Sequence, residues 1–187
     1  MKNNKGFTLV EVLAMLVVLG IIIGVTVPNI TGILNNQKTN LIAEDGIKMI
    51  ENAKNEFIVS EKVKYPEDGK CVIFTLDRLD KNSDIENGIE NGKYNKTKSF
   101  VTVKRVAKSY QYSVRLIEQL SNGKLYGISN ASESSLNSET KKNFLGEIKE
   151  DYIVDFSSAK SLDDAKNALA SDNVGGCTKD ILTGFYN

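Results

Sequence analysis

The chain begins with an almost uninterrupted apolar stretch. Between Val12 and Gln37 no side chain carries a formal charge, and about 20 consecutive apolar residues make a helix long enough to cross the hydrocarbon core of a membrane. A single carboxylate, Glu11, lies just inside one end of this stretch. An ionised group at membrane depth costs at least about 2.5 kcal/mol unless it has a partner. We therefore predict a membrane-length helix in which Glu11 has a function.

Beyond Pro28 the pattern of the chain becomes amphipathic. Apolar residues recur at spacings of three and four, as on one face of a helix. This face is formed mostly by Ile30, Ile33, Leu34, Leu41, Ile47, Ile50, Lys54, Phe57 and Ile58. Helical signals fade in the turn-like segment 64–69. We predict one continuous helix from about residue 8 to residue 62, with its first half apolar all round and its second half packed on a globular head.

The head, residues 65–187, is long enough for one domain of ordinary size. Segments 71–76 and 99–106 are rich in β-forming residues, and apolar and polar residues alternate through 110–117, which indicates strands with one buried face. The dipeptide Asn122-Gly123 is a strong hairpin signal, and 125–129 is the expected returning strand. These patterns predict an α+β fold in which an antiparallel sheet packs on the long helix.

The C-terminal part of the head is predicted to add two helices and a strand. Leu136, Thr140, Phe144 and Ile148 share one helical face, and Tyr152, Val154 and Phe156 alternate as in a strand. The segment 161–164 has the sequence of a helix start. The inner face of that last helix would hold Leu162, Ala165, Ala168 and Leu169.

The residues Gly6-Phe7-Thr8-Leu9-Val10-Glu11 follow a short leader with Lys2 and Lys5 and precede the apolar run that contains Pro28. This N-terminus closely resembles that of type IV prepilins, over about 30 residues. The resemblance implies that a prepilin peptidase cuts between Gly6 and Phe7 and that Phe7 is then N-methylated. It also implies that Glu11 pairs with the new Phe7 ammonium of a neighbouring subunit, and that the chain has a type IV pilin-like fold.

Two other interpretations of this N-terminus fit less well. A secretory signal peptide would end in a small-residue cleavage site after its apolar core, and none follows here. A plain membrane anchor would require neither the glycine before Phe7 nor a glutamate in the span. Lys2 and Lys5 favour a cytoplasmic leader, which places the head outside the membrane. The predicted parts are a leader (1–6), a hydrophobic transmembrane or filament-core helix (7–28), an amphipathic helix (29–64) and the head (65–187).

Three residues of the apolar helix are candidates for packing or bending. Gly20 and Gly24 have the spacing that allows close helix approach in membranes, although glycine also lowers helix propensity. Pro28 lacks a backbone donor and clashes with the preceding turn. We expect a kink or a locally melted stretch between Gly20 and Pro28.

The chain has two cysteines, Cys71 and Cys177. Both fall in the part predicted to be exported, where a disulfide can persist. The chain-entropy model gives roughly 4 to 5 kcal/mol as the upper limit for the stabilisation from so long a loop. The alternative is a pair of reduced thiols. A folded head that holds the two Cα atoms too far apart would exclude the disulfide.

Composition argues against an enzyme. Acidic and basic residues balance at 24 each, and the chain contains no histidine, the commonest general base. We find no phosphate-binding loop and no nucleophile motif, so we expect no catalytic residue, no cofactor and no metal. Segment 80–84 is similar to the start of a calcium loop, but Ile85 and Asn91 replace the expected glycine and glutamate. We interpret it as a solvated turn, with calcium as a minor alternative.

One basic stripe could bind DNA or another anionic surface. Its six residues are Lys93, Lys96, Lys98, Lys104, Arg105 and Lys108. The alternative, which we favour, is a set of solvent-facing residues that balances the acidic segment 77–90. The aromatic residues nearby alternate as core positions, whereas a stacking surface would need them outside.

Two classes of function remain. The first is a structural subunit, major or minor, of a type IV pilus that supports adhesion, motility or surface interaction, or of a type II secretion or competence filament. The second is a membrane-tethered surface-binding protein that never polymerises.

The expected partners are other pilin subunits, the prepilin peptidase/methyltransferase, the assembly platform and the membrane, with DNA or a host surface as further candidates. The precursor would be a single-pass protein of the cytoplasmic membrane, and the assembled form a cell-surface filament. The Lys- and Asn-rich composition favours a Gram-positive source, and the large head favours a minor subunit.

Overall fold

The computed structural model describes residues 8–81, 85, 88, 92–120, 122–149, 153–169 and 173–187, without side-chain detail for 22–35. It contains two compact units, Met1–Lys38 and Thr39–Asn187. The fold is α+β, with an N-terminal helix and a mixed sheet.

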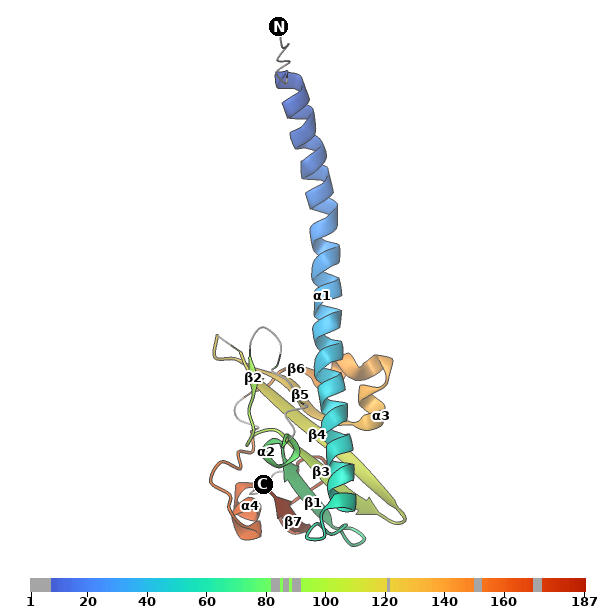
Figure 1. Cartoon of the computed structure of the whole chain (residues 1–187), viewed down its shortest axis with the longest axis vertical. Helices are drawn as coiled ribbons and strands as arrows, with labels where there is room; N and C mark the ends of the chain where they lie inside the picture. The colour runs from blue at the N-terminus through green and yellow to red at the C-terminus, as the bar shows by residue number, and fades with distance from the viewer. Residues whose placement is uncertain are drawn as a thin grey trace. The chain divides into compact units, whose positions relative to one another are not determined.

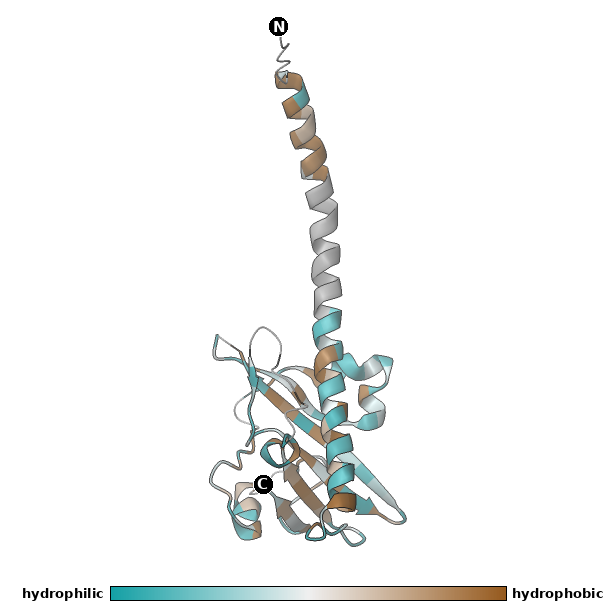
Figure 2. Cartoon of the chain, viewed as in Figure 1, coloured by the Kyte–Doolittle hydropathy of each residue, from teal (hydrophilic) through white to brown (hydrophobic). Residues whose placement is uncertain are grey.

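The first unit consists, where described, of the start of helix α1 (Leu9–Val59). Its large apolar side chains from Leu9 to Ile21 are between 47% and 84% exposed, and they give this part of the helix its hydrophobic colouring in Figure 2. Among the described residues, no helix meets the length and hydropathy needed to cross a membrane. The helix continues through Gly20, Gly24 and Pro28 without a break. The melted stretch is therefore absent from the single chain, whereas the kink stays a prediction.

The second unit is built around a sheet of seven strands (Figure 1). The strands are β1 (Cys71–Thr75), β2 (Lys93–Tyr94), β3 (Phe100–Val106), β4 (Ser109–Gln119), β5 (Leu125–Ser132), β6 (Leu145–Glu147) and β7 (Leu182–Tyr186). Their order is β6-β5-β4-β3-β1-β7, with β2 pairing to β4. All pairs are antiparallel except β1 with β7, which is parallel. The expected purely antiparallel sheet is thus wrong in this one pair.

The predicted hairpin at Asn122-Gly123 is confirmed. Strand β4 pairs with β5 up to Gln119 opposite Leu125, and Gly123 has the positive φ of +81° that favours glycine in a tight turn. Strands β1, β3 and β4 likewise form where the β-rich and alternating segments predicted them.

Both faces of the sheet are buried, and the alternation of side chains along β1 shows how. Val72 and Phe74 join a core cluster with α1 residues such as Met49 and Ile50. Cys71 joins the opposite cluster, which contains residues of helix α4 (Leu162–Leu169). Helix α1 therefore covers one face of the sheet, and α4 with the C-terminal loops covers the other.

The buried face of α1 agrees with the predicted one only in part. Ile50 is fully buried, and Ile47 and Phe57 are partly buried against the core. Leu41 and Ile58 are 56% and 78% exposed. The positions that pack on the sheet are Ile42, Gly46, Met49, Ile50 and Ala53. A Cβ added to Gly46 would lie 2.5 Å from Cδ1 of Ile128 in β5, which is closer than real Cβ atoms approach. Gly46 thus lets the helix approach the sheet closely, and apolar periodicity did not predict it because glycine has no apolar side chain.

Two predicted elements of the C-terminal part are wrong. Segment 136–148 is not one helix but the end of the short helix α3 (Glu133–Leu136), the 3-10 helix η2 (Glu139–Phe144) and β6. Ser132 and Ser138 cap the two turns separately, and pairing of β6 with β5 ends the helical path. Val154 and Phe156 are buried but lie outside any strand, and Tyr152 lies outside the described residues. Helix α4 is confirmed, and a further short helix, α2 (Leu76–Leu79), was not predicted.

Candidate functional site

The start of α1 is closed by reciprocal hydrogen bonds between Thr8 and Glu11. The Thr8 N–H donates to Oε2 of Glu11 at 2.8 Å, and the Glu11 N–H donates to the Thr8 hydroxyl oxygen at 3.3 Å. The Thr8 hydroxyl also donates to Oε2 at 2.9 Å. This is a capping box, in which two backbone donors of the first turn obtain side-chain acceptors. The spacing T-x-x-E of residues 8–11 is the sequence signature of a capping box, although Thr8 was not among the predicted functional residues.

The capping box positions the Glu11 carboxylate at the positive end of the helix dipole, which favours an anion. Both bonds that the carboxylate accepts from Thr8 reach Oε2, so Oε1 can accept from another group. The predicted cleavage and methylation residues, Gly6 and Phe7, lie outside the described residues. Pairing between Glu11 and an ammonium at Phe7 therefore stays a prediction.

At Gly20 the apolar helix presents its backbone to the surroundings. A Cβ built on Gly20 meets no atom within 4 Å, so the helix surface there is open to a close neighbour. The surroundings of Gly24 and Pro28 are not described. Close helix packing at these positions stays a prediction.

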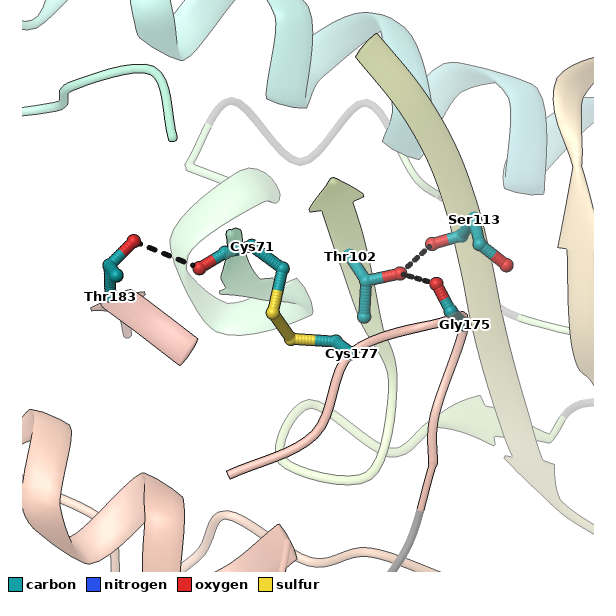
Figure 3. The surroundings of a disulfide bond; sticks show 6 residues. All are labelled: Cys71, Thr102, Ser113, Gly175, Cys177 and Thr183. Atoms are coloured by element: carbon teal, nitrogen blue, oxygen red, sulfur yellow. Dashed lines mark hydrogen bonds between the residues drawn. A yellow bond between two sulfur atoms is a disulfide. The ribbon is translucent and has the colours of Figure 1, made fainter. Parts of the chain in front are cut away.

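The disulfide that the sequence left open is present (Figure 3). Cys71 and Cys177 are both fully buried, with Cα atoms 5.8 Å apart. Cys177 closes a tight turn with Val174, since each N–H donates to the other's carbonyl at 2.9 Å. The Cys71 N–H in turn donates to the carbonyl of Ile181, at 2.9 Å. The disulfide thus ties the chain just before β7 to β1.

The turn between Val174 and Cys177 is also fixed to the sheet on its other side. Gly175 and Gly176 have φ of +58° and +78°, a conformation that glycine adopts at low cost. The Thr102 hydroxyl oxygen lies 3.3 Å from the Gly175 carbonyl oxygen and 3.4 Å from that of Ser113, and donates between them. Figure 3 shows Gly175 held beside β3 and β4 in this way.

The six residues of the candidate basic stripe, which was the less favoured interpretation, are spread along the sheet. Lys93 pairs opposite Gln119 and Lys104 opposite Gln111, at positions of β4 that are about 26 Å apart at a rise of about 3.3 Å per residue. The Nζ atom of Lys96 lies 3.6 Å from Oδ1 of Asp77. The Nζ atom of Lys98 is likewise 3.8 Å from a carboxylate oxygen of Asp155. Lys104 and Arg105 are consecutive residues of β3 and therefore point to opposite faces of the sheet, and Lys108 lies in the turn after β3.

A partly buried polar contact links α1 to strand β2. The Tyr94 hydroxyl donates to Asp45 Oδ2 at 2.9 Å. Burial, followed by the charge of Asp45, raises the pKa of Tyr94 far above its ordinary value, so Tyr94 remains a neutral donor.

Among the described residues, no group of three His, Cys, Asp or Glu side chains could hold a metal ion. Asp80 of the calcium-like segment accepts from the Ile85 N–H at 3.2 Å, while Asn82, Asp84 and Asn91 lie outside the described residues.

Comparison with known protein families gives one match. The prokaryotic N-terminal methylation motif covers residues 1–27. The chain carries a type IV prepilin-like signal. No curated protein and no solved structure matches the chain. The prepilin-like signal therefore comes from the N-terminal segment, and this match does not extend into the head.

Proposed function

We propose that this protein is a structural subunit of a type IV pilus or a related filament. The single observation that carries the proposal is the methylation motif of residues 1–27, which leads directly into helix α1. Cleavage between Gly6 and Phe7 would leave the apolar helix on the mature chain. The sheet of the second unit, with α1 across one face, supports a type IV pilin-like fold.

The geometry at the helix start supports a role for Glu11 in assembly. Thr8 already holds the carboxylate through Oε2, so a subunit can dock with this group preorganised. Its partner would be the Phe7 ammonium of a neighbouring subunit, which exists only after the leader is removed. Processing would thereby permit assembly. In a low-dielectric filament core, loss of one partner of such an ion pair typically costs about 3 to 5 kcal/mol.

The organisation that follows is a leader (1–6), a membrane or filament-core helix (7–28), an amphipathic helix (29–64) and a head (65–187). The precursor would sit in the cytoplasmic membrane with the head outside. A peptidase/methyltransferase, an assembly platform and other subunits would be its partners. The exposed apolar side chains of α1 from Leu9 to Ile21 support burial against lipid or other helices.

The decisive variants separate the charge of Glu11 from its capping role. Glu11→Gln keeps an acceptor for the Thr8 N–H, because Gln also closes capping boxes, but it removes the charge. We expect Glu11→Gln and Glu11→Ala alike to be inserted and processed, yet to reach filaments at less than about a hundredth of the normal yield. A Glu11→Gln variant that assembles normally would show that Glu11 serves only as a helix cap.

Mass spectrometry of sheared surface filaments tests the proposal as a whole. We expect a mature chain that begins with N-methylated Phe7. A processed chain that stays in the membrane fraction while filaments of other subunits are recovered would contradict the proposal. It would favour the alternative, a membrane-tethered surface protein that does not polymerise.

A further inference from the structure

Strand β4 continues past the end of its neighbour β5. Its pairing with β5 ends at Ser113 opposite Ser132, where the chain turns into α3. Its pairing with β3 continues to Ser109 opposite Val106. Within the described part of the chain, residues 109–112 thus have a strand neighbour on one side only.

This segment presents backbone hydrogen-bonding groups away from the sheet. In an antiparallel pair, successive residues alternate between bonding to the partner strand and pointing their N–H and C=O groups outward. Two of the four residues 109–112 therefore direct both groups away from β3. Such an edge is a template on which another extended chain can add a strand.

A cavity of about 620 Å³ lies along this edge. Its lining comes from three short runs of consecutive residues: 110–113 of β4, 132–134 at the start of α3, and 175–176 of the disulfide-linked turn. We call it the β4 groove. The wall formed by Gly175 and Gly176 is held by Thr102 and by the bond of Cys177 to Cys71, so the groove exists before anything binds.

The basic residue at the wall of the β4 groove is Lys104, whose Nζ would lie 3.9 Å from a Cβ on Gly176. Lys108 follows in the β3–β4 turn, where Asp68 Oδ1 accepts from the Ala107 N–H at 2.7 Å. Arg105, the neighbour of Lys104 in β3, points to the opposite face of the sheet, over the Tyr110 ring. The acidic residue of the lining, Glu133, is already paired, because Lys54 Nζ lies 2.6 Å from its Oε2. A negatively charged ligand is therefore favoured at this rim.

The two tyrosines of the lining are already engaged by other side chains. The Tyr110 ring packs against Tyr65 at a centroid distance of 4.6 Å, and the guanidinium of Arg105 lies 5.8 Å from its centroid. Lys54 Nζ lies 5.4 Å from the centroid of Tyr112. Because other side chains already pack against these two rings, the tyrosines are poorly placed to stack on a sugar ligand. Consecutive residues along a strand edge instead favour a ligand recognised through its main chain.

We propose that the β4 groove binds an extended, acidic segment of another polypeptide by strand addition to residues 109–112. Main-chain hydrogen bonds to β4 would supply the affinity, and Lys104 and Lys108 would select acidic side chains. This binding goes beyond the proposed structural role and does not depend on filament assembly.

The test uses the full-length protein in detergent micelles and blocked synthetic peptides of about eight residues, long enough to cover the edge at about 3.3 Å per residue. In three acidic peptides, glutamate alternates with valine, threonine or tyrosine. We expect at least one to bind and to slow amide hydrogen exchange at residues 109–112. N-methylation of alternate amides in that peptide should abolish binding, and replacement of its glutamates by lysine should weaken binding at least tenfold.

Protein variants locate the site. Ser134→Trp should fill the groove and abolish binding, whereas Asn137→Trp, beyond α3, should not. Lys104→Glu should weaken binding about tenfold, whereas Lys160→Glu, on the loop before α4, should have little effect. The proposal is overturned if no acidic peptide binds at about 1 mM, if the N-methylated peptide binds equally, or if a neutral oligosaccharide rather than a peptide changes exchange at residues 109–112.

Discussion

The Cα atoms of Cys71 and Cys177 lie 5.8 Å apart, although 106 positions separate the two residues in the sequence. Cys71 begins β1 and Cys177 ends the Gly175-Gly176 turn. The bond fixes the C-terminal segment at the point from which it enters the sheet as β7, parallel to β1. It therefore acts both on the stability of the head and on one wall of the β4 groove.

The double variant Cys71→Ala/Cys177→Ala should lower the free energy of unfolding by about 2 to 4 kcal/mol, because the unfolded chain regains the freedom of a long loop. Urea denaturation without reductant measures this loss. Reductant should shift the midpoint of the wild type toward that of the variant and leave the variant unchanged. Equal midpoints for the oxidised wild type and the variant would show that the disulfide contributes nothing to stability.

Gly127, the glycine of β5, lies where a side chain does not fit. Its φ is +147°, and a Cβ would overlap the carbonyl oxygen of Leu116 on β4. Gly127→Ala should therefore destabilise the protein by about 2 to 4 kcal/mol, through strain and loss of strand pairing. The matched control is Gly146→Ala, directly opposite in β6, where a Cβ meets nothing within 4 Å. Its midpoint in urea should change little, and equal effects of the two variants would refute this account.

Ala107 at the β3–β4 turn adopts a φ of +54°, and it is the non-glycine residue with positive φ among those that the structure describes. This conformation costs an L-residue about 1 to 2 kcal/mol, part of which glycine returns as unfolded-state entropy. Ala107→Gly should stabilise the protein by about 0.5 to 1 kcal/mol, measured by thermal unfolding. Lys108→Gly, at the next position, should be neutral or destabilising. If Ala107→Gly lowers the melting temperature, the turn is not strained.

Asp155 ties the loop before α4 to the turn before β3. It accepts hydrogen bonds from the Thr97 hydroxyl and the Ser157 N–H, both at 2.8 Å. Burial opposes its ionisation, but these bonds and the charge of Lys98 bring the pKa of Asp155 below its ordinary value. Because the folded-state pKa is the lower one, the stabilisation is complete above the unfolded-state pKa of about 3.9 and is lost as the pH falls through the folded-state pKa.

The pH dependence follows from that sign. At pH 7 Asp155→Asn should lower the free energy of unfolding by up to about 1 kcal/mol, a figure reduced for the partial exposure of the carboxylate. The difference from the wild type should shrink as the pH falls below about 4. Urea denaturation at a series of pH values between about 3 and 7 measures this difference in the free energy of unfolding. Asp180→Asn, on an exposed loop, is the control. A difference that grows in acid would contradict the lowered pKa.

The local patterns of the sequence predicted much of the fold. The helix predicted for about 8–62 is α1, and the segments now seen as β1, β3, β4 and β5 were predicted as strands. These predictions succeed because alternation, helical periodicity and the Asn122-Gly123 turn are written in neighbouring residues. The predicted helix through 136–148 failed because Leu145 pairs with Ile128 of β5, and such long-range pairing overrides local helical spacing.

Several features of the candidate sites were not predicted from the sequence. Thr8 could have been recognised from its spacing to Glu11 as half of a capping box. Strand β7 could not be predicted in this way, because it pairs with β1, and the partners Cys71 and Leu182 are 111 positions apart (182 − 71). The β4 groove depends on where β5 ends relative to β4, which no local signal specifies.

By itself the sequence determined the prepilin-like N-terminus, with Gly6-Phe7, Glu11 and the apolar run that follows, because these lie in one fixed register along the chain. Only the tertiary structure decided that the sheet is mixed, that Cys71 meets Cys177, and that residues 109–112 are left with an open edge. Those features arise from pairing between distant segments, whose free energy depends on the whole packed core and not on neighbouring residues.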